Sequence, residues 1–182
     1  DRRQRQMCIR DSVSALTQLH ELGLSTVMLT GDQAESARVM GALLGVGEVR
    51  AEVLPAGKSA EVQRLLTAQA GGVMMVGDGI NDAPALAAAS VGVAMGAGMD
   101  IAMESAGIVL MNNRLTGVVD AIRLSRRTIA KIRQNLFFAF IYNVLAIPLA
   151  ALGLLNPVIA GAAMACSSIS VVGNSLLLRR KR

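Results

Sequence analysis

Residues 77–86, GDGINDAPAL, decide the fold, because an apolar run leads directly into them and polar side chains follow at once. The run at 73–76 predicts a buried strand at the centre of a parallel sheet. Asp78, Asn81 and Asp82 come directly after it. Carboxylates just past the carboxyl end of a parallel strand lie where open α/β sheets bind ligands, and such oxygen donors suit Mg2+. Asp-Gly is also a common turn dipeptide, so the decapeptide alone is equally consistent with an ordinary turn.

Charge is distributed unevenly along the 182 residues. Residues 1–113 carry 8 basic and 12 acidic side chains, a net charge of −4, whereas residues 114–182 carry 10 basic side chains and one acidic, a net charge of +9. The positive charge flanks a long uncharged segment, a pattern typical of proteins at a membrane surface. We therefore expect membrane lipid among the partners and no nucleic acid.

The uncharged segment runs from residue 134 to residue 178, 45 residues without a charged side chain. A bilayer span needs about 20 apolar residues, so the segment predicts two transmembrane helices, at 135–155 and 158–178, with Asn156-Pro157 as the turn. A buried hairpin of a soluble protein is the alternative, but it should show a polar face. Basic residues outside both ends place those ends in the cytoplasm by the positive-inside rule.

The part before the uncharged segment alternates between helical and strand-like patterns, after a lead at 1–11 that predicts no structure. Such alternation indicates a parallel, doubly wound sheet. Helices are predicted at 12–22, 34–44, 59–70, 83–88 and 101–105, and strands at 24–29, 49–53, 73–76, 91–95 and 108–111. The predicted domains are a cytoplasmic α/β part at 1–118, a basic linker helix at 119–134, two transmembrane helices at 135–178 and a basic tail at 179–182.

Two further motifs carry chemistry that suits a phosphoryl group. Thr30-Gly31-Asp32 follows an apolar strand, where a hydroxyl and loop amides can hold a phosphoryl oxygen; the plain alternative is a turn with Asp32 as a helix cap. Lys58 can neutralise phosphate charge, although a solvated surface lysine is the simpler interpretation of the residue alone. Gly57-Lys58-Ser59 is not a P-loop, because that motif requires glycine where Glu52 stands.

The order of the motifs is more specific than any one of them: TGD, then PxxK, then GDGxNDxPAL. In this order they resemble the second half of the phosphorylation domain of P-type ATPases, over about residues 12–182. The resemblance implies a partial α/β domain of the haloacid-dehalogenase-like type, with a Rossmann-like parallel sheet, followed by a two-helix transmembrane hairpin. It implies that Asp78 and Asp82 bind Mg2+. It also implies a catalytic site, around an aspartyl-phosphate, made of Thr30, Gly31, Asp32, Lys58 and Asn81.

Polar residues inside the two predicted spans narrow the family, because such groups are costly in a bilayer and are functional candidates. They resemble the last two helices of copper-transporting P-type ATPases, which implies a site for transported Cu+ made of Tyr142, Asn143, Met164, Ser167 and Ser168. A thioether suits soft Cu+, and neither span contains the Asp, Glu or Lys expected of a zinc or cadmium pump. The alternatives are that the two serines only bond backbone or pack helices, and that Tyr142 is an interfacial anchor.

For the complete protein, the resemblance implies export of Cu+, or Ag+, from the cytoplasm across the cell membrane, with ATP as substrate, Mg2+ as cofactor and a copper chaperone as partner. The sequence contains no Asp-Lys-Thr-Gly nucleophile, no Thr-Gly-Glu loop and no Cys-Pro-Cys span. We therefore expect it to be the C-terminal portion of a transporter, inactive alone. A zinc/cadmium-type ATPase and a non-catalytic membrane module that binds metal are the alternatives.

Overall fold

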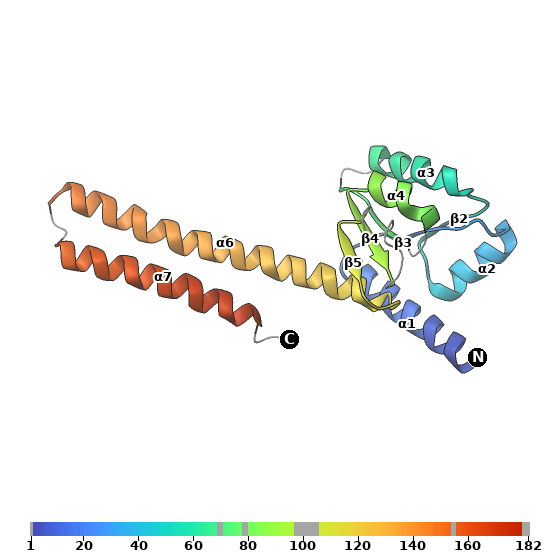
Figure 1. Ribbon diagram of the computed structural model, residues 1–182, viewed down its shortest axis with the longest axis horizontal. Coiled ribbons are helices and arrows are strands. Elements are labelled where there is room, and N and C mark those ends of the chain that lie inside the picture. The colour runs from blue at the N-terminus through green and yellow to red at the C-terminus, as the bar shows by residue number, and fades with distance from the viewer. Residues whose placement is uncertain (1, 69–70, 78–79, 97–105, 154–155, 180–182) are drawn as a thin grey trace. The chain divides into compact units, whose positions relative to one another are not determined.

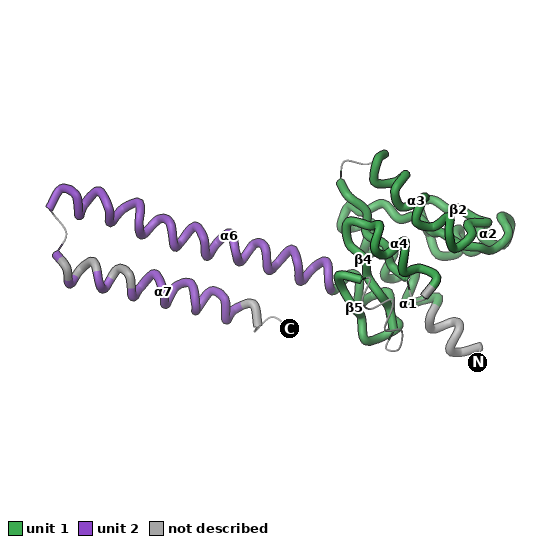
Figure 2. Tube along the Cα trace, turned by 45° about the horizontal axis from the view of Figure 1, so that its top comes forward, with its two compact units in different colours: residues 1–120 green, residues 121–182 purple. Residues whose placement is uncertain are grey.

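The computed structural model describes residues 2–68, 71–77, 80–96, 106–153 and 156–179. Asp78 and the predicted helix at 101–105 lie outside these ranges. The chain divides into two compact units, residues 1–120 and residues 121–182, shown in different colours in Figure 2. Each unit is described by itself.

Unit 1 alternates helices with short strands along the chain (Figure 1). The strands form two parallel sheets, one with β1 beside β2 and one with the order β3–β4–β5, so the predicted parallel α/β architecture is confirmed. The elements are α1 (Arg2–Glu21), β1 (Val27–Leu29), α2 (Ala34–Leu44), β2 (Glu48–Arg50), α3 (Pro55–Ala68), β3 (Met74–Gly77), the 3-10 turn η1 (Ile80–Asp82), α4 (Ala83–Ala88), β4 (Val91–Met95) and β5 (Ile108–Leu110).

β4, and not β3, is the central strand of the three-stranded sheet. The interior of β4 is buried, whereas β3 is half-buried to exposed, so the prediction of a central, buried strand at 73–76 is wrong. Gly92 explains why β4 is covered: a Cβ atom there would lie 2.7 Å from the carbonyl oxygen of Leu86. The absence of a side chain lets α4 approach the middle of the sheet, and Leu86 is buried there beside Ala94.

The predicted lack of structure at residues 1–11 is also wrong. α1 begins at Arg2 and continues without a break to Glu21. This lead contains no glycine or proline and is rich in arginine and glutamine, which are good helix formers. Asp11 lies within the helix and pairs with Arg114 at 3.2 Å. One face of α1 buries Ala15, Leu16 and Leu19.

Several predicted boundaries coincide with the observed ones, namely those of α2, α4 and β4. Gly45 ends α2 in the left-handed conformation, with φ of 72°, and its N–H bonds the Ala42 carbonyl. The remaining predicted strands and α3 are present, with individual ends displaced by up to four residues. A glycine cap therefore located the end of α2, whereas the predicted start of α3 was four residues too late.

Unit 2 contains most of α6 (Thr116–Ala151) and all of α7 (Pro157–Arg179), which run side by side in Figures 1 and 2. The predicted linker helix at 119–134 and the first predicted span are one continuous helix. That helix ends before the predicted residue 155, because Gly153 adopts the left-handed conformation with φ of 71°. The predicted second helix is present with one extra residue at each end.

α6 is long and apolar enough to cross a membrane, and none of its most apolar window is buried. In α7 the described apolar stretch is the shorter Ala165–Leu177. Large apolar side chains are exposed on both helices, among them Phe137, Leu145 and Ile169. A soluble hairpin would present a polar face at these positions, so an apolar solvent suits both helices better.

Candidate functional site

The first group of predicted site residues follows β3. The chain leaves β3 at Gly77, and after Asp78 and Gly79, which are not described, it forms η1 and then α4. Asn81 is exposed in η1, whereas Asp82 is buried at the junction of η1 and α4. The predicted role of Asp78 in Mg2+ binding therefore lies outside the described residues, and the described part of the site begins with Asp82.

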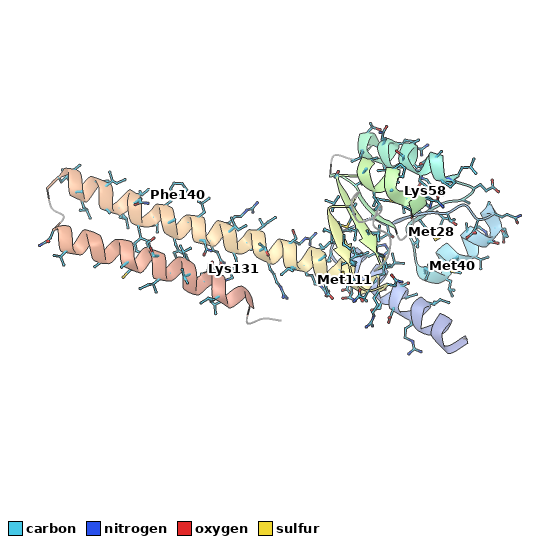
Figure 3. All side chains as sticks on the ribbon, in the orientation of Figure 1. Met28, Met40, Lys58, Met111, Lys131 and Phe140 are labelled. Carbon is cyan, nitrogen blue, oxygen red and sulfur yellow. The ribbon has the colours of Figure 1, made fainter. Side chains whose placement is uncertain are left out.

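Asp82 is paired with Lys58, which lies 24 positions earlier in the chain and is labelled in Figure 3. The Lys58 Nζ atom donates to Asp82 Oδ1 at 2.7 Å, and the two side chains are only 19% and 10% exposed. Lys58 reaches this position because Pro55 starts α3, and Lys58 lies in its first turn with its N–H bonded to the Leu54 carbonyl. A partly buried ion pair is weakly screened by water, so this lysine holds the carboxylate in one place.

Gly77 makes room for the Asp82 carboxylate. A Cβ atom at Gly77 would lie 2.7 Å from Asp82 Oδ2 and 2.8 Å from Asp82 Cβ. Real Cβ atoms do not approach other atoms so closely, so any side chain at this position would displace Asp82. Packing against Asp82 therefore explains why a glycine stands at the end of β3.

Gly77→Ala in the complete protein is expected to lower the free energy of unfolding by about 1–3 kcal/mol, because the methyl group overpacks the site. Thermal unfolding measures the loss. Gly71→Ala is the matched control, because its Cβ meets no atom within 4 Å. Wild-type stability in Gly77→Ala would contradict this account of the glycine.

Thr30 and Asp32 form a second local pair, at the carboxyl end of β1. The Thr30 Oγ1 atom donates to Asp32 Oδ2 at 3.0 Å and accepts from the Asp32 N–H at 3.1 Å. The loop after β2 supports this turn, because Val53 N donates to the Thr30 carbonyl and Glu52 N to the Asp32 carbonyl, both at 3.0 Å. In this contact Glu52 has a positive φ of 57°, a backbone conformation that residues other than glycine rarely adopt.

Asp32 does not cap α2, since Gln33 is the capping residue and makes no side-chain cap bond. Gly31 lies exposed in the same turn. Among the described residues, no hydrogen bond joins the Thr30–Asp32 pair to the Lys58–Asp82 pair. The structure thus joins Thr30 to Asp32, both predicted to be catalytic, and Lys58 to Asp82, a predicted Mg2+ ligand.

The donor chemistry of the described residues fits Mg2+ in part. Asp82 supplies a carboxylate and Asn81 an exposed amide oxygen, both hard ligands of the kind Mg2+ takes. Within the described ranges, no group of three or more His, Cys, Asp and Glu side chains is close enough to hold a metal ion alone. Mg2+ ordinarily binds proteins through only one or two carboxylates, and phosphate oxygens and waters complete its coordination shell.

The second group of predicted site residues lies on α6 and α7. Tyr142 and Ser167 are half-buried, whereas Asn143 and Ser168 are exposed. The Asn143 amide donates to the Ala139 carbonyl one turn earlier in its own helix, at 2.9 Å. The side chain of Met164 lies outside the described part of α7.

One polar group on these helices escaped prediction. Lys131, from the predicted basic linker helix, joins the amides of Asn135 and Asn174 in one hydrogen-bonded cluster. The signal was present in the sequence as two asparagines inside a run without charges. What the sequence alone could not provide was the register that brings them together.

Comparison with known proteins places both units in one family. Residues 5–90 match the model of the haloacid dehalogenase-like hydrolases. The chain is 56% identical over 170 residues to "Probable copper-exporting P-type ATPase V" of Mycobacterium tuberculosis, covering 93% of this chain and 22% of that protein. It is 54% identical over 173 residues to "Probable copper-importing P-type ATPase A" of Enterococcus hirae, covering 94% of this chain and 24% of that protein.

The structure is also similar to a crystal structure of a zinc-transporting PIB-type ATPase in its E2.Pi state, with a TM-score of 0.82 and 38% identity. The match covers 91% of this chain and 27% of that one. It confirms the predicted fold class, a haloacid-dehalogenase-like α/β domain followed by a two-helix transmembrane hairpin. The family model, which starts at residue 5, also includes part of the lead at 1–11. The chain spans about a fifth of the length of the curated relatives it matches. With the motifs, the parallel α/β unit and the apolar hairpin in agreement, the chain belongs to the heavy-metal P-type ATPases.

Proposed function

We propose that the complete protein uses ATP to export a soft monovalent metal ion, Cu+ or Ag+, through an aspartyl-phosphate intermediate. In this proposal unit 1 supplies part of the phosphorylation site and unit 2 supplies part of the intramembrane metal site. The observation that carries the first half is the Lys58–Asp82 pair, a cation held beside a carboxylate just after a parallel strand.

Lys58 is the group that stabilises negative charge on the phosphoryl oxygens. A phosphoryl group in transfer carries charge on its three equatorial oxygens, and a preorganised ammonium stabilises that charge most effectively where water is partly excluded. Before the phosphoryl group arrives, Asp82 holds the lysine in place at 2.7 Å. In this proposal the same phosphoryl group is also contacted or oriented by Thr30, Gly31, Asp32 and Asn81. An aspartate upstream of this chain accepts that group.

Asp78 and Asp82 are the proposed ligands of Mg2+, with Asn81 beside them. When bound, this ion neutralises charge on the phosphoryl oxygens. Asp82 then has two successive partners, Lys58 in the free site and the cation in the loaded site. Its burial and the close approach to Gly77 limit its movement, which supports this proposal.

The metal is proposed to be Cu+ because of the donors available on α6 and α7. Residues 134–178 contain one thioether candidate in the motif, Met164, and no carboxylate, so the site suits a soft monovalent ion better than Zn2+. The names of the copper-transporting relatives support this choice, whereas the zinc-transporting structure is less similar in sequence. Those names include one exporter and one importer, so the direction of transport is part of the proposal.

The orientation follows from charge. Basic residues precede and follow the apolar hairpin, which places both of its ends in the cytoplasm and the Asn156-Pro157 turn outside, in the cell membrane. A copper chaperone on the cytoplasmic side is the proposed source of the ion, since free Cu+ binds thiolates of other proteins tightly.

Phosphorylation of the purified complete protein by labelled ATP tests this proposal. We expect Cu+ to raise the level of an acid-stable, hydroxylamine-sensitive phosphoprotein, as an acyl phosphate on aspartate requires. A label that resists hydroxylamine, or one that Zn2+ raises and Cu+ does not, would overturn the proposed chemistry or the proposed metal, respectively.

A further inference from the structure

A cluster of uncharged and basic side chains joins α6 to α7 within unit 2. Lys131 Nζ donates to Asn174 Oδ1 at 2.6 Å, and Asn135 Nδ2 donates to Ser175 Oγ at 2.8 Å. Asn174 Nδ2 donates to Asn135 Oδ1 at 2.8 Å and, more weakly, to Gln134 Oε1 at 3.4 Å. Figure 3 labels Lys131 on the side of α6 that faces α7. The two helices are thus connected by directional bonds and not only by apolar packing.

The order of donors in this cluster fixes the orientation of each amide. An ammonium can only donate, so Lys131 requires the oxygen of the Asn174 amide on its side. The nitrogen of that amide then faces the oxygen of Asn135, whose own nitrogen faces Ser175. Ser175 Oγ donates to the Val171 carbonyl at 2.8 Å, so the chain of hydrogen bonds ends on the backbone. Rotation or sliding of either helix breaks the chain at several bonds at once.

The cluster lies about two helical turns from the proposed metal site on both helices. Tyr142 is seven residues beyond Asn135 on α6, and Ser167 is seven residues before Asn174 on α7. Seven residues are nearly two turns, so they return to the same helix face within about 20° and advance about 10.5 Å. Because the helices run antiparallel, both steps lead in the same direction along the hairpin.

Burial agrees with this periodicity. Asn135, Tyr142, Ser167 and Asn174 are all half-buried, although most side chains of these helices are exposed. Halfway between the two levels, Ala139 and Ser170 are half-buried as well. The same seam between α6 and α7 therefore contains the cluster at one level and the Tyr142–Ser167 pair of positions one heptad away.

We propose that Lys131, Gln134, Asn135, Asn174 and Ser175 form a register lock, which sets Tyr142 of α6 level with Ser167 of α7. The positional role in metal binding rests on the proposed function, whereas the lock itself does not. Apolar helices in lipid have no hydrophobic force that favours one axial register over another. Polar side chains at seam positions do select a register, because every other register leaves them without partners. Lys131 adds to this selection, because its partly buried ammonium would lose the oxygen of Asn174 in any other register.

The register is measured directly by the distance between two spin labels in the complete protein, in nanodiscs. Phe140→Cys and Ile169→Cys place the labels at one level on exposed positions, with Cys8 and Cys166 replaced by serine. We expect one narrow distance distribution in the parent. Asn174→Leu should broaden it or add a population displaced by one turn, about 5.4 Å along the axis. An unchanged distribution in Asn174→Leu would overturn the lock.

The consequence for the metal is measured by Cu+ competition with a chromogenic chelator. Asn174→Leu should weaken binding at the intramembrane site by about tenfold, the smaller end of the effect of groups that orient ligands. Lys131→Met should do the same, and Lys131→Arg should restore most of the affinity, because it keeps donors on a long stem. If Lys131 had a purely structural role, Lys131→Met and Lys131→Arg would not differ in their affinity for Cu+.

Matched controls keep the two claims separate. Ser175→Ala removes a hydroxyl inside the cluster, whereas Ser170→Ala removes one from the same helix outside it. Only the first should change the label distance and the Cu+ affinity, and equal effects of both would overturn the lock. If the parent protein binds no Cu+, the proposed function fails, but the label distances still decide the lock.

Discussion

Replacing Lys58 by methionine in the complete protein is expected to lower the rate of phosphorylation by ATP about 100- to 1,000-fold, the usual cost of removing one preorganised donor from a site of developing negative charge. The effect should appear mainly in the rate constant rather than in the apparent affinity for ATP, since the lysine is proposed to act on charge that grows during transfer. Rapid-quench measurement of phosphoprotein formation separates the two quantities.

Arg64→Met is the matched control for this substitution. Arg64 lies in the same helix, α3, is largely exposed, and has only a long contact of 3.8 Å with Glu61. It should phosphorylate at the wild-type rate, and Lys58→Arg should retain part of the activity, because the charge remains while its geometry changes. Phosphorylation of Lys58→Met at the wild-type rate would remove Lys58 from the proposed mechanism.

Replacing Met164 by leucine is expected to weaken Cu+ binding at the intramembrane site at least about tenfold, because a ligand should cost no less than the outer groups that orient it. The exchange preserves apolar character and nearly preserves volume, so stability should change little. Equilibrium competition for Cu+ and the sulfur contribution to the X-ray absorption spectrum of the bound ion measure the loss.

Met111→Leu provides the same exchange at an exposed position of unit 1 and should leave both quantities unchanged. A Met164→Leu protein that binds Cu+ with the wild-type affinity and an unchanged sulfur signal would contradict the assignment. Phosphorylation by ATP in that variant should lose its dependence on Cu+ while the protein still binds nucleotide, which distinguishes a defect of the metal site from unfolding.

Elements whose ends depend on neighbouring residues could be predicted from the sequence. α2 ends where Gly45 allows the left-handed conformation, and α4 begins after Asp82 with Pro84 in its first turn, as helices commonly do. α1 could not be delimited in this way, because a short lead of good helix formers becomes helical only where it continues a helix that packs.

Pairing across the sheet could not be predicted. The apolar runs of β3 and β4 look alike, yet β4 pairs with strands on both of its sides and Gly92 admits α4 over it. The same limit applies to the site: the sequence places Lys58 and Asp82 24 residues apart, and only the path from α3 to η1 brings them to 2.7 Å.

The polar cluster on α6 and α7 is the strongest example of that limit. A basic run next to an apolar helix ordinarily faces lipid headgroups, and the sequence gives no reason to exempt Lys131. Its bond to Asn174, 43 residues later, depends on the antiparallel register of two helices. Composition identifies such residues as polar and out of place, but it does not identify their partners.

ATP-driven uptake of metal into inside-out membrane vesicles that contain the complete protein tests the central claim most directly. We predict that Cu+ accumulates inside the vesicles only with Mg2+ and ATP, that Ag+ competes with it, and that Lys58→Met abolishes the uptake. Accumulation of Zn2+ without Cu+, or Cu+ uptake that needs no ATP, would contradict the account.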